Sequence, residues 1–180
     1  MPKSDGSLHG LIAEYLASPE YEKLATSSKE QYRRALDAAR ERFEFVNISD
    51  LEEDRMVQEI FEWRDAMRNT PTKSNSYISV LNAVFPWAQK RRKIKYSPAQ
   101  SVELLKTTGR KDKIWTQQQL EGFCDVAPPK VRDIFLAALF TGKRNGDVRK
   151  MKWSDYDGEW LYVKREKTGA VVNLPVHKLQ

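Results

Sequence analysis

The sequence predicts a mainly α-helical chain in two parts, the second of which ends in a small antiparallel β-hairpin. Three observations predict this fold class. Apolar residues recur every three or four positions through residues 12–88, the period of helices with one buried face. A polar, charged stretch containing a glycine then interrupts the pattern. Helical periodicity returns beyond it, and near residue 160 the period changes to the strict alternation of a strand.

Four helices are predicted in the first part. Their apolar faces begin at Ile12, Tyr32, Met56 and Ile78. The second helix is expected over residues 27–43, with the hydroxyl side chains of residues 26–28 as caps at its start. Pro86 lies inside the fourth helix and predicts a kink. Four helices of this length indicate a small helical bundle.

The boundaries of the two parts follow from composition. We expect a helical domain over residues 1–106, a basic linker over 107–113 and a second domain over 114–180. In the second domain Thr116 and Gln119 form a capping-box pattern, and Gly142 is placed to end a later helix. Residues 159–164 and 170–174 are predicted to pair as a hairpin, with Trp160 and Tyr162 on one face.

Positive charge is concentrated in one segment. The chain carries a formal net charge of +6, yet residues 86–113 alone hold nine basic and two acidic side chains. Such a segment on a nearly neutral body is typical of a protein that binds a polyanion. A basic linker that is merely solvated explains the charge alone equally well.

Composition also excludes several classes of site. The single cysteine cannot form an internal disulfide, and the two histidines are far apart, so we expect no metal site and no cofactor. No apolar run approaches the roughly 18 residues that span a bilayer, so we expect no membrane partner. The first ten residues are polar and unlike a secretory signal, which favours a cytoplasmic protein.

The run T-G-K-R-N-G-D-V at residues 141–148, followed by M-K-W-S-D-Y-D at 151–157, resembles the tyrosine recombinases of the phage-integrase type. The family pattern is T-G-x-R-x-x-E/D and then W-x-D-I/V-D, from which Tyr156 departs. The K-T-G at 167–169 and V-N-L-P at 172–175 resemble the family's hairpin. W-T-Q-Q-Q-L at 115–120 resembles the opening of the catalytic domain, and N-A-V-F-P-W-A at 82–88 the last long helix of the core-binding domain.

The resemblance covers essentially the whole chain and implies its fold and activity. It implies a SAM-like helical core-binding bundle followed by a truncated α+β catalytic domain, and site-specific DNA recombination or integration. A family member cuts DNA by attack of a tyrosine hydroxyl on a backbone phosphate, which expels a 5′ hydroxyl. The resemblance makes Arg144 the cation that stabilises the phosphoryl oxygens, Asp147 its supporting carboxylate and Lys167 the general acid. Without the resemblance, the Arg144 and Asp147 pair would be explained as surface electrostatics, and Lys167 as a solvated lysine in a turn.

The partner that the resemblance implies is double-stranded DNA at attachment-type sites, in a bacterial or phage-encoded, nucleoid-associated protein. Full-length members assemble on DNA as a tetrameric synapse, so we expect homo-oligomers there. Helix starts with hydroxyl and basic side chains, the basic run after the fourth helix and the linker are the expected contacts. These are Ser27, Ser28, Lys29, Arg33, Arg34, Lys73, Ser74, Asn75, Tyr77, Arg91, Arg92, Lys93, Arg110, Lys111 and Lys113.

Two further functions stay open at this point. The family's H-x-x-R block and late nucleophilic tyrosine are not found in these 180 residues, so we expect no DNA cleavage by the chain as given. In the first alternative, the chain is a DNA-binding module without catalysis, derived from a degenerate or truncated integrase. The other alternative is a helical protein-interaction module whose basic segment binds an acidic partner.

Overall fold

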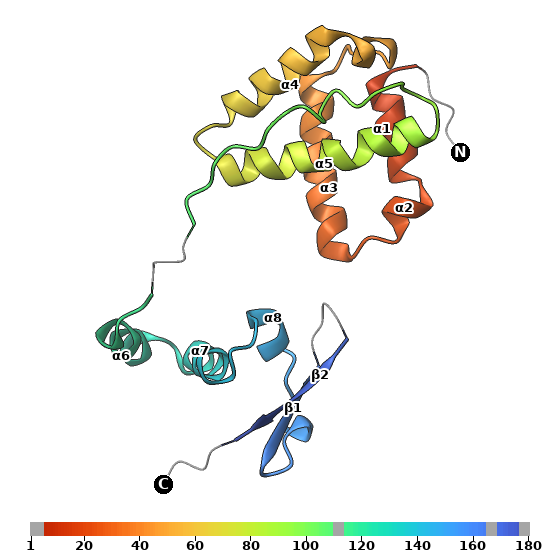
Figure 1. Cartoon of the computed structure of the whole chain (residues 1–180). Helices are drawn as coiled ribbons and strands as arrows, with labels where there is room; N and C mark the ends of the chain where they lie inside the picture. Colours follow the sequence, from red (N-terminus) through yellow and green to blue (C-terminus); the bar gives the residue numbers. More distant parts are fainter. Residues whose placement is uncertain (1–5, 110–113, 165–168, 177–180) are drawn as a thin grey trace. The chain divides into compact units, whose positions relative to one another are not determined.

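The computed structural model describes residues 6–109, 114–164 and 169–176. The chain divides into two compact units, Met1–Gly109 and Arg110–Gln180. The described residues form a mainly helical structure with one two-stranded antiparallel sheet (Figure 1), which confirms the predicted fold class. Within the described ranges, no helix has the length and apolar character needed to cross a membrane.

The described residues of the first unit, 6–109, form five α-helices and one 3₁₀ helix. They are α1 (Leu8–Leu16), α2 (Pro19–Glu22), α3 (Thr26–Arg42), η1 (Ser49–Glu52), α4 (Asp54–Ala66) and α5 (Pro71–Lys90). Helix α2 is not among the predicted helices, because four residues are too few for a periodic pattern, although Ser18 caps it and Pro19 starts it. The predicted cap of α3 is also wrong: Ala25 occupies that position without a side-chain bond.

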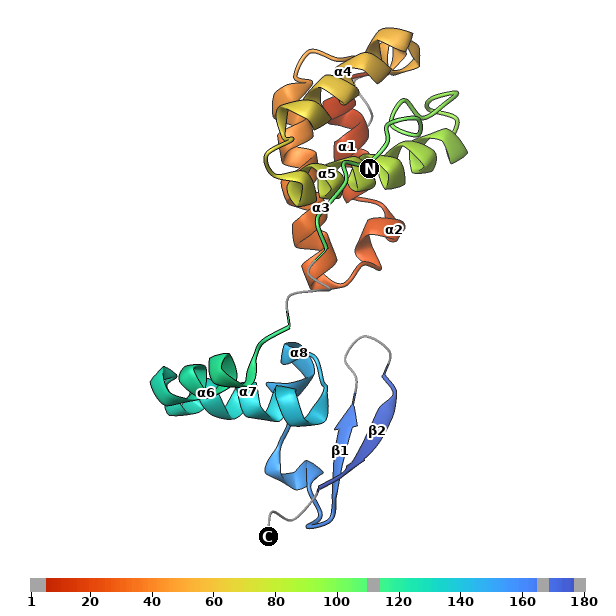
Figure 2. The same cartoon turned by 60° about the vertical axis from the view of Figure 1, so that its left-hand side comes forward.

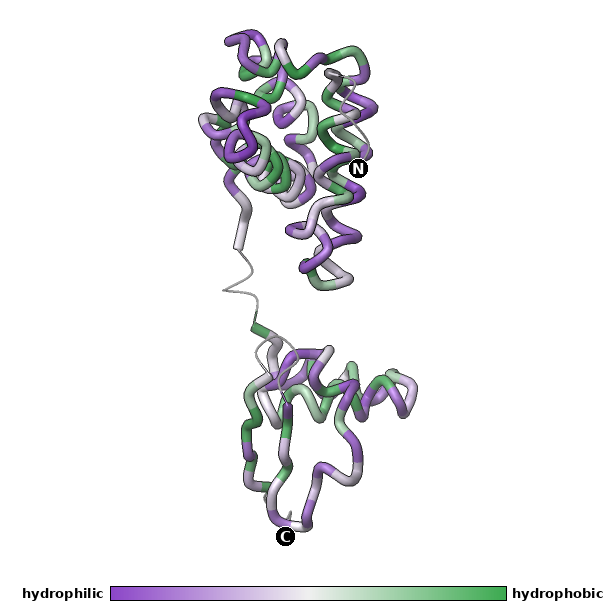
Figure 3. The backbone as a smooth tube through the Cα atoms, turned by 90° about the vertical axis from the view of Figure 1, so that its right-hand side faces the viewer, coloured by the Kyte–Doolittle hydropathy of each residue, from purple (hydrophilic) through white to green (hydrophobic). Residues whose placement is uncertain are grey.

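The core of the first unit lies between α3, α5 and the helices that cover them. Helices α3 and α5 cross and pack on each other (Figures 1 and 2). Leu11, Leu36, Ile60, Ile78 and Phe85 are among its fully or almost fully buried side chains. Figure 3 shows apolar and polar stretches alternating along these helices, as amphipathic helices require. Helix α5 remains a single element through Pro86.

The chain does not leave the first unit where α5 ends. Residues 94–105, which we call the return strap, run back across the helices toward the start of α5 (Figure 1, green). Ile94, Ala99 and Val102 of the strap are buried in the core. Arg64 of α4 donates to the carbonyl of Glu103 at 2.8 Å. The strap is therefore part of the first unit and not part of a free linker.

The second unit contains α6 (Gln117–Val126), α7 (Pro129–Thr141), α8 (Asn145–Val148), η2 (Trp153–Asp155), β1 (Trp160–Lys164) and β2 (Val171–Pro175). Both bonds of the predicted capping box at Thr116 and Gln119 are present. The two strands pair antiparallel, from Trp160 opposite Pro175 to Lys164 opposite Val171. Trp160 and Tyr162 share the exposed face of β1, as the alternation predicts.

The second unit buries few of its apolar side chains. Among its described residues only Asp147, Val148 and Val163 are buried, whereas Trp153 is 91% and Phe140 82% exposed. An apolar groove of about 620 Å³ lies between α7, η2 and the hairpin, with Ile134 and Leu161 in its wall. The apolar core of the first unit is thus covered, whereas the described residues of the second unit leave much of their apolar surface exposed.

Candidate nucleic-acid interface

A groove of about 350 Å³ lies between the first turns of α3 and α5. Its lining combines hydroxyl, amide, aromatic and charged side chains: Ser27, Glu30, Gln31, Arg34, Lys73, Ser76 and Tyr77. The structure therefore brings together Ser27, Arg34, Lys73 and Tyr77, which lie up to fifty residues apart in the sequence. Ser76 is not among the predicted contacts, although it shares a helix face with Lys73 and Tyr77 at helical spacing.

The walls of the groove are joined and held in place. Across it, Gln31 Nε2 donates to Ser76 Oγ at 2.9 Å. The Tyr77 ring packs against Trp63 with 5.6 Å between ring centroids, so a core residue fixes its orientation. The Lys73 ammonium lies 5.5 Å from the Tyr77 centroid, within cation–π range. Arg34 faces Glu30 at 3.6 Å, and both side chains are largely exposed.

The helix geometry adds positive potential to these cations. Both α3 and α5 begin at this groove, at Thr26 and Pro71. Neither start has a side-chain cap, so the amide groups in the first turn of each helix have no capping oxygen from a side chain. A helix start carries about half a positive charge, and two such starts at one groove favour an anion.

Lys29 and Arg33 form a second basic group on α3, around Tyr21. Arg33 Nε donates to the Tyr21 hydroxyl at 3.0 Å, and that hydroxyl donates to the Lys29 carbonyl at 3.2 Å. The Lys29 ammonium lies 5.9 Å from the Tyr21 ring centroid. Helix α2, which carries Tyr21 and is absent from the sequence prediction, therefore positions two of the predicted cations. Ser28 lies between the two groups and is half-buried.

Two predicted contacts on α5 face away from the groove. Ser74 is fully buried and donates to the Arg64 carbonyl at 3.1 Å, so its hydroxyl cannot reach a phosphate. Asn75 is half-buried and uses both ends of its amide on the backbone of Leu105 in the return strap. For Ser74 the expectation of a DNA contact is wrong, because its buried hydroxyl holds the first unit together, whereas the contact expected of Asn75 stays a prediction.

The basic run after α5 is mainly engaged with acidic residues of the same unit. Arg91 Nη2 contacts Glu20 Oε1 at 2.8 Å and its guanidinium stacks on Trp87, whose indole also donates to Glu20. Lys93 contacts Glu14 at 2.6 Å. The Arg91 bond is the first of several hydrogen bonds that lower the pKa of Glu20 to about 2. Arg92 is exposed, in a left-handed backbone conformation.

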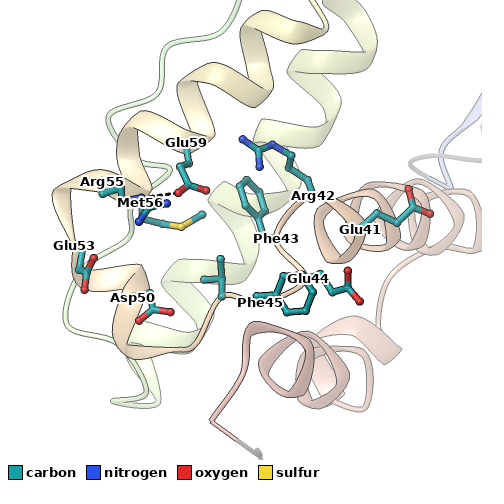
Figure 4. Close-up of a pocket in the computed structure, with 11 residues that line it drawn as sticks. Glu41, Arg42, Phe43, Glu44, Phe45, Asp50, Glu53, Arg55, Met56 and Glu59 are labelled. Carbon is teal, nitrogen blue, oxygen red and sulfur yellow. Dashed lines mark hydrogen bonds and ion pairs between the residues drawn. The ribbon is translucent and has the colours of Figure 1, made fainter.

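These paired cations lie far from the groove. Helix α5 has 20 residues, and a helix of that length spans about 30 Å, so Lys73 and Arg91 lie at opposite ends of it. Another hollow lies at the C-terminal end of α3, around Phe45, and more of the side chains that line it are acidic than basic (Figure 4). That hollow repels phosphates. The N-terminal ends of α3 and α5 are therefore the face of this unit that suits nucleic acid.

In the second unit, backbone geometry directs Arg144. Gly142 ends α7 in the left-handed conformation, with φ 62°, and Arg144 occupies the position that caps α8. The Arg144 carbonyl accepts from the amides of Asp147 at 2.9 Å and Val148 at 3.0 Å. Its own side chain is exposed, and Asp147 is 6% exposed. The arginine is thus presented to solvent from a closed turn, beside a buried carboxylate.

Four predicted site residues cannot be located. Lys167 lies outside the described residues, and so do Arg110, Lys111 and Lys113 of the linker. In the ranges that the structure describes, no group of three or more His, Cys, Asp or Glu side chains could hold a metal ion.

The start of the hairpin is well fixed, because Asp157 accepts from the amides of Glu159 and Trp160 and from the Tyr162 hydroxyl.

The sequence is similar to those of phage and prophage integrases. No family model matches the chain. The integrase of Enterobacteria phage 434 is 29% identical over 99 residues, 54% of this chain and 28% of that protein. The prophage integrase IntE of Escherichia coli strain K12 is 29% identical over 150 residues, 81% of this chain and 40% of that protein. The chain therefore spans less than half the length of these relatives.

Solved structures share the fold. A lambda integrase dimer bound to a COC′ core site matches 94% of this chain and 48% of its own, with a TM-score of 0.80 and 20% identity. A lambda integrase tetramer bound to a Holliday junction matches 97% of this chain and 51% of its own, with a TM-score of 0.79 and 23% identity. The chain is thus similar in sequence to phage and prophage integrases and shares the fold of the lambda integrase structures.

Proposed function

We propose that this chain is the DNA-binding part and the first portion of the catalytic part of a phage-type site-specific recombinase. Its first unit binds double-stranded DNA at attachment-type sites. The observation that carries the proposal is the groove between α3 and α5, where four predicted contacts meet at two helix starts. The lambda integrase complexes with DNA and with a Holliday junction support the same assignment.

The groove binds the sugar-phosphate backbone of the duplex. Lys73 and Arg34 supply the charge, while Ser27, Gln31 and Ser76 supply hydrogen bonds to phosphate oxygens. Lys29 and Arg33 extend the contact along α3. Such contacts set the position of the protein on the duplex and carry little sequence information. Binding through them is steeply salt-dependent, because each neutralised phosphate releases counterions.

Arg144 acts on the phosphate under attack in the second unit. A planar guanidinium can donate to two phosphoryl oxygens at once, and a donor that is already oriented stabilises the transition state without reorganisation. The left-handed turn at Gly142 and the closed turn of α8 supply that orientation, and Asp147 supports it. Lys167 protonates the leaving 5′ oxygen. None of the chain's seven tyrosines is assigned as the nucleophile.

A second candidate is a DNA-binding module without strand cleavage. It is favoured by one observation: every residue that lines the groove belongs to the first unit, so duplex binding needs no part of the second. Both candidates bind DNA, and they differ only in whether Arg144 takes part in strand cleavage. In a recombinase that carries this sequence, Arg144→Ala abolishes strand cleavage and leaves duplex binding intact. In the alternative, Arg144→Ala changes neither property.

The first test is duplex binding measured by fluorescence anisotropy at salt concentrations from about 50 to about 200 mM. The logarithm of the affinity should fall linearly with the logarithm of salt. Lys73→Ala and Arg34→Gln should each weaken binding to all sequences alike and reduce the slope by about 1. Tyr77→Ala should also weaken binding, because it removes the surface on which Lys73 rests.

The matched control is Arg55→Gln, which removes an exposed cation that contacts Glu59 in the mainly acidic hollow at the C-terminal end of α3. It should leave both affinity and slope unchanged. Equal losses from Arg55→Gln and Lys73→Ala would mean that net charge alone drives binding, and would remove the groove from the proposal. Binding that is indifferent to salt would favour an acidic protein partner over DNA.

A further inference from the structure

The groove between α3 and α5 is lined by one acidic side chain, Glu30. It lies there together with Arg34 and Lys73, the two cations that we assign to phosphate binding. A carboxylate repels the phosphate backbone, so at this place it opposes the two cations. Helix α3 begins at Thr26, and Glu30 lies beyond its first turn, where the positive potential of the helix start has fallen off. The helix start therefore does not explain why an acidic residue lies in the groove.

The two cations of the groove are held in different ways. The Lys73 ammonium lies 5.5 Å from the centroid of the Tyr77 ring. That ring carries no net charge, so Lys73 can bind a phosphate oxygen and keep its ring contact. Arg34 Nη2, in contrast, lies 3.6 Å from Glu30 Oε2, which belongs to an anion. A phosphate and the Glu30 carboxylate therefore compete for the same guanidinium.

The pair between Glu30 and Arg34 is weak enough to be exchanged. The Arg34 side chain is 76% and the Glu30 side chain 63% exposed, so water already surrounds both charges. The two residues are four apart with the carboxylate on the N-terminal side, the orientation that favours pairing on a helix. Exposed pairs of this kind contribute little, whereas a guanidinium can hold a phosphate through two hydrogen bonds. Arg34 can therefore leave Glu30 for a phosphate, and breaking the pair lowers the net affinity.

We infer that Glu30 attenuates DNA binding, because it holds Arg34 in the free protein and repels the phosphate that replaces it. The inference rests on the proposed function of the groove and adds a residue that opposes binding there. Both effects act on the sugar-phosphate backbone, so Glu30 lowers the affinity for every duplex sequence alike. A carboxylate that accepted a hydrogen bond from the amino group of a cytosine would do the opposite and raise the affinity for particular sequences.

The experiment compares wild type and Glu30→Gln, both as the full chain, in the salt-dependent duplex assay on several duplexes of different sequence. Glu30→Gln keeps the size of the side chain and removes its charge. It should tighten binding to every duplex roughly threefold or more and steepen the salt slope by up to about 1, because Arg34 then binds phosphate without competition. Unchanged or weaker binding would overturn the inference. Weakening that is confined to certain sequences would overturn it in favour of base reading.

A second comparison tests whether the effect depends on Arg34. In an Arg34→Gln background there is no guanidinium to compete for, and only the repulsion remains. Glu30→Gln should therefore tighten binding by a factor roughly twofold smaller in that background than in the wild type. An equal gain in both backgrounds would overturn the competition for Arg34.

The matched control is Asp37→Asn on the same helix. Asp37 pairs with Arg40 at 3.5 Å and its side chain is 62% exposed, much like Glu30. It lies seven residues further along α3, about 10 Å from Glu30, and is not among the residues that line the groove. Asp37→Asn should leave the affinity nearly unchanged. A gain equal to that of Glu30→Gln would mean that net charge alone sets the affinity, and would overturn the inference.

The failure of this inference differs from the failure of the proposed function. If the wild type binds duplex DNA with the expected salt slope and Glu30→Gln binds no tighter, only the inference fails. If neither protein shows salt-dependent binding, the groove assignment fails and the role of Glu30 fails with it.

Discussion

Gly142 determines how Arg144 is presented to solvent. Its φ of 62° lies in the left-handed region, where a side chain bearing Cβ is strained. A Cβ built at this position would meet no atom within 4 Å, so the requirement for glycine comes from the backbone and not from crowding. The turn therefore depends on one residue, and Arg144 lies two positions beyond it.

Gly142→Ala should lower the stability of the second unit by about 1 kcal/mol, because alanine must adopt the left-handed conformation there. Gly142→Asn should cost less, since asparagine tolerates that region better. The measurement is urea unfolding followed by the tryptophan fluorescence of the second unit. Gly122→Ala is the opposite control: Gly122 lies inside α6 in open space, so alanine there should stabilise by about 0.5–1 kcal/mol. Losses of stability in both variants would contradict the argument.

At the scale of elements, the two ends of α5 make different kinds of contact. Its first turns carry the groove, and its last turn is joined to α2 through Arg91, Trp87 and Glu20. Glu20 accepts hydrogen bonds from both of the other side chains. The ion pair is partly exposed, so its contribution at neutral pH is modest. The pH dependence of the stability that this ion pair contributes is nevertheless readily measured.

Glu20→Gln should remove part of the acid sensitivity of the first unit. The Arg91 hydrogen bond is the largest cause that lowers the pKa of Glu20 to about 2 in the folded state, from an ordinary value of 4.5. A carboxylate whose pKa is lower in the folded than in the unfolded state stabilises the fold above pH 4.5. This stabilisation is lost as the pH falls toward 2. The melting temperature of the wild type should therefore fall more steeply than that of Glu20→Gln between pH 4.5 and 2.

The control for that measurement is Glu22→Gln, which removes one negative charge from the same short helix. Glu22 makes no ion pair with the described residues, so its melting curve should follow that of the wild type through the acid range. A parallel fall of the wild type and Glu20→Gln would show that the Arg91 contact does not form in solution.

The elements show why part of the interface could be predicted from the sequence. Local signals sufficed for the helix faces, for the capping box at Thr116 and for the glycine that ends α7. The phase of a helix is also a local signal: Ser74 precedes Ile78, Leu81 and Phe85 at spacings of four, three and four, so it lies in the buried stripe. Applied to position 74, that pattern excludes a DNA contact.

The partners of the basic run could not be predicted in this way. Arg91 and Glu20 are 71 residues apart, and their contact exists only because α5 packs beside a one-turn helix that has no periodic signal. A count of charge along the chain treats Arg91 and Lys93 as free cations, whereas the fold pairs each with an acidic residue. The same holds for Asn75, whose partner Leu105 lies 30 residues away.

On the scale of the whole molecule, the two units differ in how much they bury. The first has a continuous core from Leu8 to Val102, while the described second unit leaves Trp153 and Phe140 largely exposed. Exposed apolar surface of this kind promotes binding to other apolar groups. Because the two units are separately compact, each should unfold on its own.

Calorimetry of the chain should therefore show two transitions, with the second unit melting at the lower temperature. A dye that binds exposed apolar surface should bind at neutral pH before any unfolding. The double substitution Phe140→Ser with Trp153→Ser should reduce that dye signal without changing duplex binding by the first unit. A single cooperative transition, with no dye binding below it, would mean that the apolar side chains of the second unit are covered in solution.

The ring contact between Tyr77 and Trp63 has a practical consequence. Tyr77 lines the groove on one side and touches an indole of the core on the other, with 5.6 Å between the rings. A phosphate that displaces the phenol ring must change the surroundings of that indole, and with them its emission. If the groove binds phosphate as proposed, the emission of Trp63 should change on binding, and titrations could be followed on unlabelled protein.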